Sequence, residues 1–405
     1  MISQSSLARR VPFSLRALTL GFLALWIVIA LFPLLWITVM SFRLPVDALA
    51  SNPLTVLLGP RTLAAGEGLS ILDALLSVAV FFAVVRVIAR QASPLAARLS
   101  LAESPALGWL LSGALLGIAA LVVLAGLLPP ALRLAAWLVR PIPGVGMLAE
   151  PVIGFTARHY VAVWAGHGFW RNFVNSLTVT AGVVTISLTF GTLAGYAFAR
   201  NGSRLAFFLL IAALIFRALP NSTLVAGYLP FFVRSRELLQ PLWDAPVLGS
   251  VLSLFAEHPP TLYGKPIAVI AALVAINQPF TIWMLRSFFQ TVPSELDEAA
   301  RVDGCSHFGA FRRVIMPVMW PGVITTGLFS FLLAYNDYLV CALLLDAQSQ
   351  TMVPAISQFF NRETTSTDQI EAIAAAVSIT APLFLLVMVF QKQIVSGLTA
   401  GAVKG

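Results

Sequence analysis

The sequence has few charged residues and few cysteines, and both shortages exclude classes of protein. Only 10% of its 405 residues are charged, whereas an average soluble domain is about one quarter charged. The two cysteines, Cys305 and Cys341, are too few for a disulfide framework or a cysteine metal site. The chain also lacks a Walker loop and any other glycine-rich phosphate-binding loop, so we expect no catalytic residues, no cofactor and no metal in it.

What the chain has in excess is apolar surface. Hydrophobic residues make up 59% of it, and its mean hydropathy is +0.90. A soluble fold of this size cannot bury so much, so most of it must face lipid. We predict an all-α polytopic membrane protein with about eight transmembrane helices. The apolar windows cover Ala17–Phe42, Leu69–Val85, Ser104–Leu132, Asn172–Ala199, Leu205–Val233, Pro266–Leu285, Val318–Leu345 and Ala372–Val395.

The basic residues predict the orientation. A formal charge of +8 would suggest nucleic acid in a soluble protein, but here the basic residues lie between apolar blocks, as the positive-inside rule describes. An even number of spans places both termini on the same side of the membrane, and the positions of the basic residues make that side the cytoplasm. The last outside loop is then net acidic. Four arginines contradict this pattern, on a long loop where the rule is weaker. They are Arg133, Arg140, Arg158 and Arg171.

Two stretches look like additions to a smaller core. We divide the chain into a cytoplasmic N-terminus with the first span (1–44), an insertion with two extra spans and an outside loop (45–168), a core (169–395) and a cytoplasmic tail (396–405). A proline-rich outside loop at 234–265 is the second addition.

The most informative segment is the loop at 293–317, between the sixth and seventh spans. Ser294 precedes three acids and can cap a helix, while Gly304 is suited to end it. The pattern predicts a short amphipathic helix along the membrane face. On physical grounds alone, an ordinary charged loop is the simpler interpretation.

The spacing within this loop changes that interpretation. Glu298-Ala299-Ala300, then Gly304 after three residues, then Val314, Met316 and Pro317, resembles the signature loop of ATP-binding-cassette importer permeases. In that family the loop is a coupling helix that docks on a cytoplasmic ATPase subunit. The resemblance assigns ATPase coupling to Glu298, Ala299, Ala300, Asp303, Gly304 and Pro317.

Further segments resemble the carbohydrate-importer branch of the family. They are Ser41-Phe42-Arg43, Asn172-Phe173-Val174-Asn175-Ser176, Ala194–Arg200, Phe280–Arg286 and Tyr335-Asn336-Asp337-Tyr338. The C-terminus, Gly397–Gly405, is similar to the G-type subunit of maltose importers. The resemblance covers 11–43 and 169–405, and the two additions depart from it.

The resemblance implies a permease subunit in a bacterial inner membrane, not itself an enzyme, that imports maltose, maltodextrin or a related α-glucoside. The implied partners are a second permease, two copies of an ATPase subunit that bind ATP and Mg, an extracytoplasmic solute-binding protein, the sugar and membrane lipid, with no nucleic acid. The alternative is the same machine for another sugar or glycerol phosphate. An ion-coupled secondary transporter is a third reading, but it would need titrating acids, and the core spans contain only Asp337.

Four polar residues inside apolar windows are candidates for the substrate path: Asn277, Gln278, Asn336 and Asp337. Each has a structural alternative. The helix can break at Asp337, which then caps a neighbour, and the two amides can bond neighbouring helices together. Arg217 can line the path or, as we favour, extend to the membrane surface.

The tail after the last span is a further candidate contact with the ATPase. The resemblance favours entry into the ATPase dimer interface, by Leu398, Thr399, Gly401 and Lys404. Composition alone is equally compatible with a frayed end, because glycine recurs and apolar bulk is small.

Overall fold

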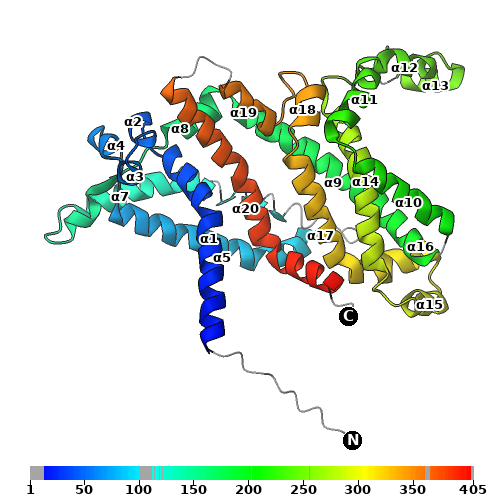
Figure 1. Cartoon of the computed structure of the whole chain (residues 1–405), viewed down its shortest axis with the longest axis horizontal. Helices are drawn as coiled ribbons and strands as arrows, with labels where there is room; N and C mark the ends of the chain where they lie inside the picture. Colours follow the sequence, from blue (N-terminus) through cyan, green and yellow to red (C-terminus); the bar gives the residue numbers. More distant parts are fainter. Residues whose placement is uncertain are drawn as a thin grey trace, which may run out of the picture. The chain divides into compact units, whose positions relative to one another are not determined.

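The computed structural model describes residues 13–99 and 112–402, apart from 114, 118, 121, 202, 255 and 361–364. The chain is helical and divides into two compact units. Met1–Val161 with Thr364–Val377 form unit 1, and Ala162–Glu363 with Ser378–Gly405 form unit 2. Figure 1 shows the elements in order along the chain.

The expected all-α membrane fold is confirmed, but the count of eight spans stays a prediction. Among the described residues, six helices are long and apolar enough to cross a membrane, and a pair bent by 98°, Phe207–Arg217 with Ser222–Val233, gives up to a seventh. The six are Ser14–Ser41, Ile71–Leu95, Leu115–Val139, Phe169–Arg200, Pro266–Phe289 and His307–Tyr335. The last predicted window lies in the final helix, where several side chains are outside the described part of the structure.

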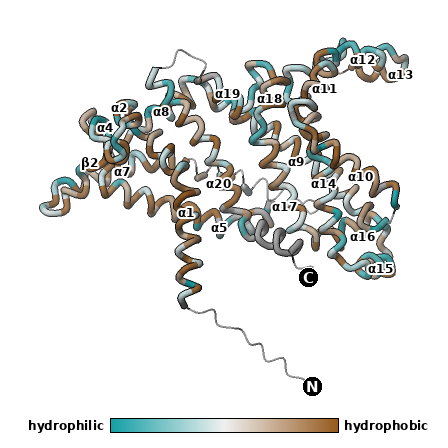
Figure 2. Tube along the Cα trace, in the orientation of Figure 1, coloured by the Kyte–Doolittle hydropathy of each residue, from teal (hydrophilic) through white to brown (hydrophobic). Residues whose placement is uncertain are grey.

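Unit 2 is built on the three long helices α9, α14 and α17, and its elements extend from η3 to α20. They are η3 (Ala162–Gly166), α9 (Phe169–Arg200), α10 (Arg204–Arg217), α11 (Asn221–Val233), α12 (Ser235–Trp243), α13 (Pro246–Leu252), α14 (Pro266–Phe289), α15 (Glu295–Val302), α16 (His307–Ala310), η4 (Phe311–Ile315), α17 (Met316–Tyr335), α18 (Leu339–Leu344), α19 (Met352–Phe360) and α20 (Ser366–Ala402), whose first residues belong to unit 1. The 234–265 addition therefore contains two short helices. Figure 2 shows the hydrophilic character of α15 beside the mainly hydrophobic long helices.

Glycines let α9 approach α14 closely. A Cβ at Gly191 would lie 2.6 Å from a Thr281 methyl, and one at Gly195 would lie 3.0 Å from the Leu285 Cβ. Small residues at such crossings bring backbones together and increase dispersion contacts in lipid, where no hydrophobic effect drives helices together. This contact supports a buried cluster at the end of α14 nearest α15: Leu285, Phe289, Val292, Phe311, Ile315, Met319 and Val323.

Unit 1 contains a small folded region where a loop was expected; it comprises residues 42–70 and 146–161, and we call it the cap. The elements of unit 1 are α1 (Phe13–Ser41), α2 (Pro45–Ala48), α3 (Pro53–Leu58), α4 (Pro60–Ala64), β1 (Gly68–Ser70), α5 (Ile71–Leu99), η1 (Val122–Leu127), α7 (Leu128–Val139), η2 (Gly146–Ala149), β2 (Pro151–Gly154) and α8 (Arg158–Val161). Strands β1 and β2 pair antiparallel.

Two features of the inserted windows become clear in the structure. Asp73, inside the window Leu69–Val85, lies in the first turn of α5, where its carboxylate accepts from the Ser70 amide and hydroxyl. The helix of the window Ser104–Leu132 does not end at Pro129 and Pro130, which lie just after the π-helical η1, but continues to Val139.

Two buried ionic side chains hold the cap together. The guanidinium of Arg43 donates to the carbonyls of Val56 and Leu57, at 2.8 and 2.5 Å, and to that of Gly154. The carboxylate of Asp47 accepts from the Thr62 amide and hydroxyl, at 2.6 and 2.7 Å. Because both side chains bond mainly backbone, they fix the turns after α1 to each other and to β2.

His159 is a third buried group in the cap, and sequence reasoning passed over it. Its ring Nε2 lies 3.0 Å from the Arg43 carbonyl oxygen, and the residue is 2% exposed. Burial lowers the pKa of His159 below 6.5. The effect of burial outweighs the carbonyl contact and the acids Glu371 and Glu67, which raise the pKa of His159. The charge of Arg158 lowers this pKa further.

This pKa shift predicts that acid loosens the cap. Above about pH 6.5 the ring is neutral in folded and unfolded states. As the pH falls below that value, the unfolded state binds the proton first, so stability is lost through the lowered folded pKa. Hydrogen exchange of peptides 42–70 and 146–161, corrected for intrinsic rates, should be faster at pH 5.5 than at pH 7.5. His159 is the only histidine of unit 1, so His159→Gln should remove this difference. A difference that persists in the variant would show that another group causes the pH dependence.

Candidate functional site

The predicted amphipathic helix exists as α15, but it begins differently from expectation. Ser294 has helical backbone angles, φ −68° and ψ −23°, and its side chain makes no capping bond. Its carbonyl accepts from the amides of Asp297 and Glu298, so the chain is already helical there. The capping role expected for Ser294 is therefore wrong, and the acids of the first turn stabilise this end through the helix dipole.

The end of α15 is as predicted. Gly304 has φ +85°, in the left-handed region. Its amide donates to the Arg301 carbonyl, and the Cys305 amide donates to the Ala300 carbonyl. These two bonds form a Schellman motif, which needs a positive φ at the glycine.

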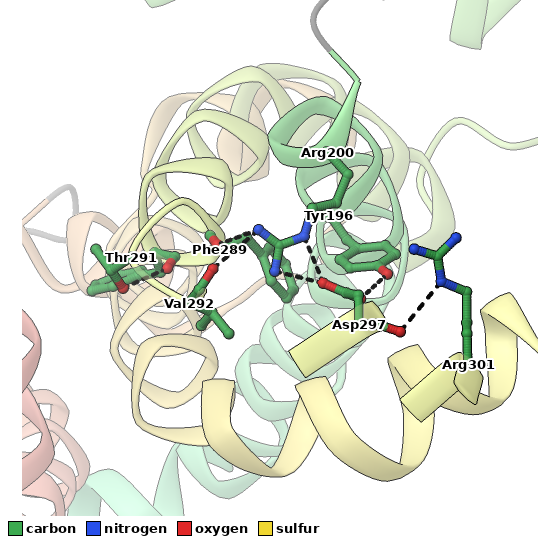
Figure 3. Close-up of polar contacts among 8 residues, drawn as sticks. Tyr196, Arg200, Phe289, Thr291, Val292, Asp297 and Arg301 are labelled. Carbon is green, nitrogen blue, oxygen red and sulfur yellow. Dashed lines mark hydrogen bonds and ion pairs between the residues drawn. The ribbon is translucent and has the colours of Figure 1, made fainter. Parts of the chain in front are cut away.

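A buried ion pair attaches α15 to the end of α9. Asp297 is 7% exposed, and its carboxylate accepts a hydrogen bond from Arg200 Nε at 2.8 Å. Nη2 of Arg200 lies 2.7 Å from the same carboxylate oxygen, as part of the ion pair. The Tyr196 hydroxyl donates to the same carboxylate. Figure 3 shows that Arg200 also reaches the carbonyl of Val292, at 3.1 Å, ahead of α15. One arginine therefore fixes the helix and the turn that leads into it.

Sequence reasoning missed this network. Asp297 was predicted only as one of the acids of the helix start, Tyr196 and Arg200 lay inside the segment 194–200, and no contact between these residues was predicted. The usable signal was their combination: an acid in the first turn of a short helix, and an arginine at the end of a span on the same side. Pattern alone does not pair two segments about 97 residues apart.

The opposite face of α15 is exposed. Asp297 and Ala300 point inward, whereas Glu295, Glu298, Ala299 and Val302 are exposed, with Val302 at 86%. These four positions follow the i, i+3, i+4, i+7 spacing of one helix face. Of the coupling candidates, Glu298 and Ala299 lie on this face, and Ala300 supports it from behind.

The remaining coupling candidates flank the helix. Asp303 is the exposed C-cap residue of α15 and precedes Gly304. Pro317 is exposed in the first turn of α17, beyond the π-helical η4. Asp303 and Pro317 thus lie at the two ends of the compact loop between α15 and α17 and do not form one contiguous patch.

The path candidates lie in different environments. Asn277 is buried and donates to the Ser330 hydroxyl at 2.7 Å, joining α14 to α17. Gln278 donates to the Ser187 carbonyl of α9 at 3.4 Å. Both amides bond neighbouring helices, as one alternative expected.

The other two path residues lie where the seventh window breaks. The break falls between Tyr335 and Leu339, and Asn336 is exposed at it. Asp337 caps α18, as the alternative interpretation expected, and its carboxylate accepts from the amides of Val340 and Cys341 at 2.8 and 3.2 Å. It also lines a cavity, whereas Asn336 does not.

The tail candidates are only partly described. The backbone of α20 is helical through Ala402, beyond the predicted end of the span near Val395. Leu398, Thr399 and Gly401 lie on this helical extension, and their side chains are outside the described structure. Lys404 lies wholly outside the described residues.

The opposite end of α9 has a clamp of its own. Asn172 and Asn175 donate amide protons to the Gln350 carbonyl, at 2.9 and 3.1 Å, and Asn175 also reaches the Gln348 carbonyl. The Ser176 hydroxyl accepts from the Met352 amide at 2.8 Å. The motif quoted from the sequence thus holds the loop that leads into α19.

A multi-pass helical membrane protein with a protruding, buttressed helix between two spans is the architecture of a transporter permease. Comparison with known proteins identifies the class: residues 187–399 match the model of the family described as binding-protein-dependent transport system inner membrane component. The chain belongs to that family of ABC importer permeases, multi-pass proteins of the inner membrane, in which ATP hydrolysis lies on partner subunits.

Curated relatives align over most of their own length. A diacetylchitobiose uptake system permease protein of Streptomyces coelicolor is 32% identical over 294 residues, 71% of this chain and 96% of the relative. A trehalose transport system permease protein of Mycobacterium tuberculosis is 30% identical and covers 62% and 82%. A trehalose/maltose transport system permease protein of Thermococcus litoralis is 30% identical and covers 64% and 85%.

Solved structures are more distant. A chain of a bacterial ABC transporter that imports the acidic polysaccharide alginate aligns with 70% of this chain and 95% of its own, at 19% identity and a TM-score of 0.45.

The ion pair predicts the behaviour of Asp297→Ala. Loss of the carboxylate leaves the guanidinium of Arg200 without its partner in a largely buried setting, which costs about 3–5 kcal/mol locally. Hydrogen exchange over 293–304 in the assembled transporter should rise, while α9 stays protected. Glu257→Ala, which removes an exposed acid outside α15, is the control. Equal exchange in wild type and Asp297→Ala would exclude the attachment.

The Schellman motif predicts graded effects at Gly304. An added Cβ meets no atom within 4 Å, so the cost of substitution is the positive φ alone. Gly304→Val should destabilise the helix end by about 1–2 kcal/mol, and Gly304→Asn should cost less, because asparagine tolerates this conformation. ATP-driven uptake should fall in the order wild type, Asn, Val. Equal losses for both variants would point to a steric cause instead.

Proposed function

We propose that this chain is a permease subunit of an ATP-driven importer of a neutral di- or oligosaccharide. The relatives support the substrate class, since their names include diacetylchitobiose, trehalose, maltose and maltodextrin. Maltose, maltodextrin or another α-glucoside remains our first candidate. Another sugar or glycerol phosphate is the alternative within the same machine.

The proposed assembly contains a second permease, two copies of a cytoplasmic ATPase subunit and an extracytoplasmic solute-binding protein. This chain binds no cofactor; ATP and Mg belong to the ATPase. Both termini and α15 lie in the cytoplasm in this arrangement. The proposal rests on family membership and on the positive-inside pattern of the sequence.

One observation carries the mechanism: α15 is exposed on one face and bonded to α9 on the other. The exposed face has two acids beside Ala299, whose small side chain permits close approach of a partner. Carboxylates there can pair with basic groups on the ATPase. When the ATPase dimer closes on ATP, a displacement of α15 passes through Asp297 and Arg200 into α9.

The C-terminal extension is a second contact in this proposal. Leu398, Thr399 and Gly401, on the helical extension of α20, reach the ATPase together with Lys404, which follows the described residues. A helix rises about 1.5 Å per residue, less than half the length of an extended strand. The helical backbone through Ala402 therefore shortens the reach that an extended tail would have.

Reversal of charge at Glu298 tests the coupling role. Glu298→Lys should leave the complex in the membrane but lower ATP-driven sugar uptake at least tenfold, because a cation then faces the basic groups expected on the ATPase. Radiolabelled uptake into proteoliposomes measures this. Glu257→Lys makes the same change at an exposed site in the 234–265 loop and should transport normally. Normal uptake by Glu298→Lys would refute the role of this residue.

A further inference from the structure

Two interrupted spans of unit 2 meet at one cavity. Helix α10 ends at Arg217, and α11 begins at Asn221 after a bend of 98°. The second break separates α17 from α18, between Tyr335 and Leu339. Non-helical backbone within a membrane is tolerated where it is buried in protein or lines a water-filled space. Broken helices also surround the binding sites of many transporters.

The cavity is polar at both breaks and apolar between them. It has a volume of about 240 Å³, and Arg217 and Asp337 supply its charged groups. Its other lining residues are Leu214, Ala218, Leu273, Ile276 and Leu333. A space with apolar walls and a few fixed polar groups is the usual form of a small-molecule site.

The guanidinium of Arg217 has unused hydrogen-bond donors in this cavity. Its guanidinium carbon lies 4.6 Å from the centre of the Phe280 ring, so the side chain extends over this ring of α14. Its extension to the membrane surface stays a prediction. Within the described part of the chain, the guanidinium makes no hydrogen bond or ion pair. Its five N–H groups are therefore available to a ligand.

Asp337 is held in place and still has acceptor capacity. One carboxylate oxygen accepts from the amides of Val340 and Cys341, which fixes its orientation. A carboxylate has about four lone-pair sites, so two amide bonds leave acceptors for a ligand. The cavity thus presents the free donors of Arg217 and the remaining acceptors of the oriented Asp337 carboxylate.

We propose that this cavity is a subsite for one neutral sugar ring, contributed by this subunit to the translocation path; the proposal rests on the sugar-import function above. Hydroxyl groups donate and accept, so one ring can bond Arg217 and Asp337 at once. Its C–H faces fit the leucine and isoleucine walls. Because the two charges cancel, an acidic sugar would face Asp337 and an amino sugar with a free ammonium would face Arg217, each at an electrostatic cost.

Arg217 could instead serve only to join two helices, and the chain offers a matched control for this. Arg286 of α14 lies over Phe207 of α10, at 5.2 Å, which mirrors Arg217 of α10 over Phe280 of α14. Both contacts join the same helices, but only Arg217 lines the cavity between the breaks. Arg286→Gln and Arg217→Gln therefore separate helix joining from sugar contact.

The test uses the complete transporter in proteoliposomes with its binding protein. The probes are labelled trehalose, maltose and diacetylchitobiose as neutral sugars, and an alginate trisaccharide and glycerol 3-phosphate as anions. The readout is sugar taken up per ATP hydrolysed. We expect uptake of at least one neutral sugar and of neither anion by the wild type. Arg217→Gln and Asp337→Asn should lower the ratio at least tenfold, Arg217→Lys should lower it less, and Arg286→Gln should preserve it.

The outcomes separate this proposal from the function on which it rests. ATP-dependent uptake that Glu298→Lys abolishes but Arg217→Gln and Asp337→Asn leave at the wild-type ratio would overturn the subsite alone. Equal losses of uptake and ATP hydrolysis in Arg217→Gln and Arg286→Gln would show a joining role and also overturn it. Uptake of an anion in place of neutral sugars would overturn the assignment of charge. Uptake of none of the probes would overturn the subsite and the sugar-import function together.

Discussion

The ion pair between Asp297 and Arg200 is the constraint on which the working end of the molecule depends. It lies among apolar side chains, where two opposite charges attract strongly but each is costly alone. Nη1 of Arg200 donates to the carbonyls of Phe289, the last residue of α14, and of Val292, and the Tyr196 hydroxyl donates to Asp297. Without this arrangement, an eight-residue helix with three acids in its first turn would have little reason to keep a fixed place.

The membrane fold and the position of the protruding helix could be predicted because each follows from local sequence. Apolar windows are long and charge-poor, and Gly304 marks a helix end whatever lies around it. The cap of unit 1 could not be predicted in the same way. Its stability comes from Arg43 and Asp47 bonding distant backbone groups, and no periodic pattern encodes such contacts.

The candidate site divides along the same line. Family spacing located Glu298 and Ala299, which are exposed and need no partner within the chain. The buried partner Asp297 was overlooked, because its role exists only when α15 meets α9. Arg217 was expected to line the path or to extend to the membrane surface, and only the fold places its guanidinium over an aromatic ring of another helix. Local chemistry therefore predicts what a residue can do, while tertiary contacts decide which use is made of it.

Helix α9 is bonded at both of its ends to elements that follow it far along the chain. Its first turns hold the loop before α19 through Asn172, Asn175 and Ser176, and its last turn holds α15. It spans 32 residues, about 48 Å at the usual rise, and is free of internal proline, whereas α1, α5, α14, α17 and α20 each contain one. Proline is the commonest cause of a sharp bend in a helix. One continuous, proline-free helix therefore links the loop before α19 to α15, so a displacement of either contact acts on the same piece of backbone.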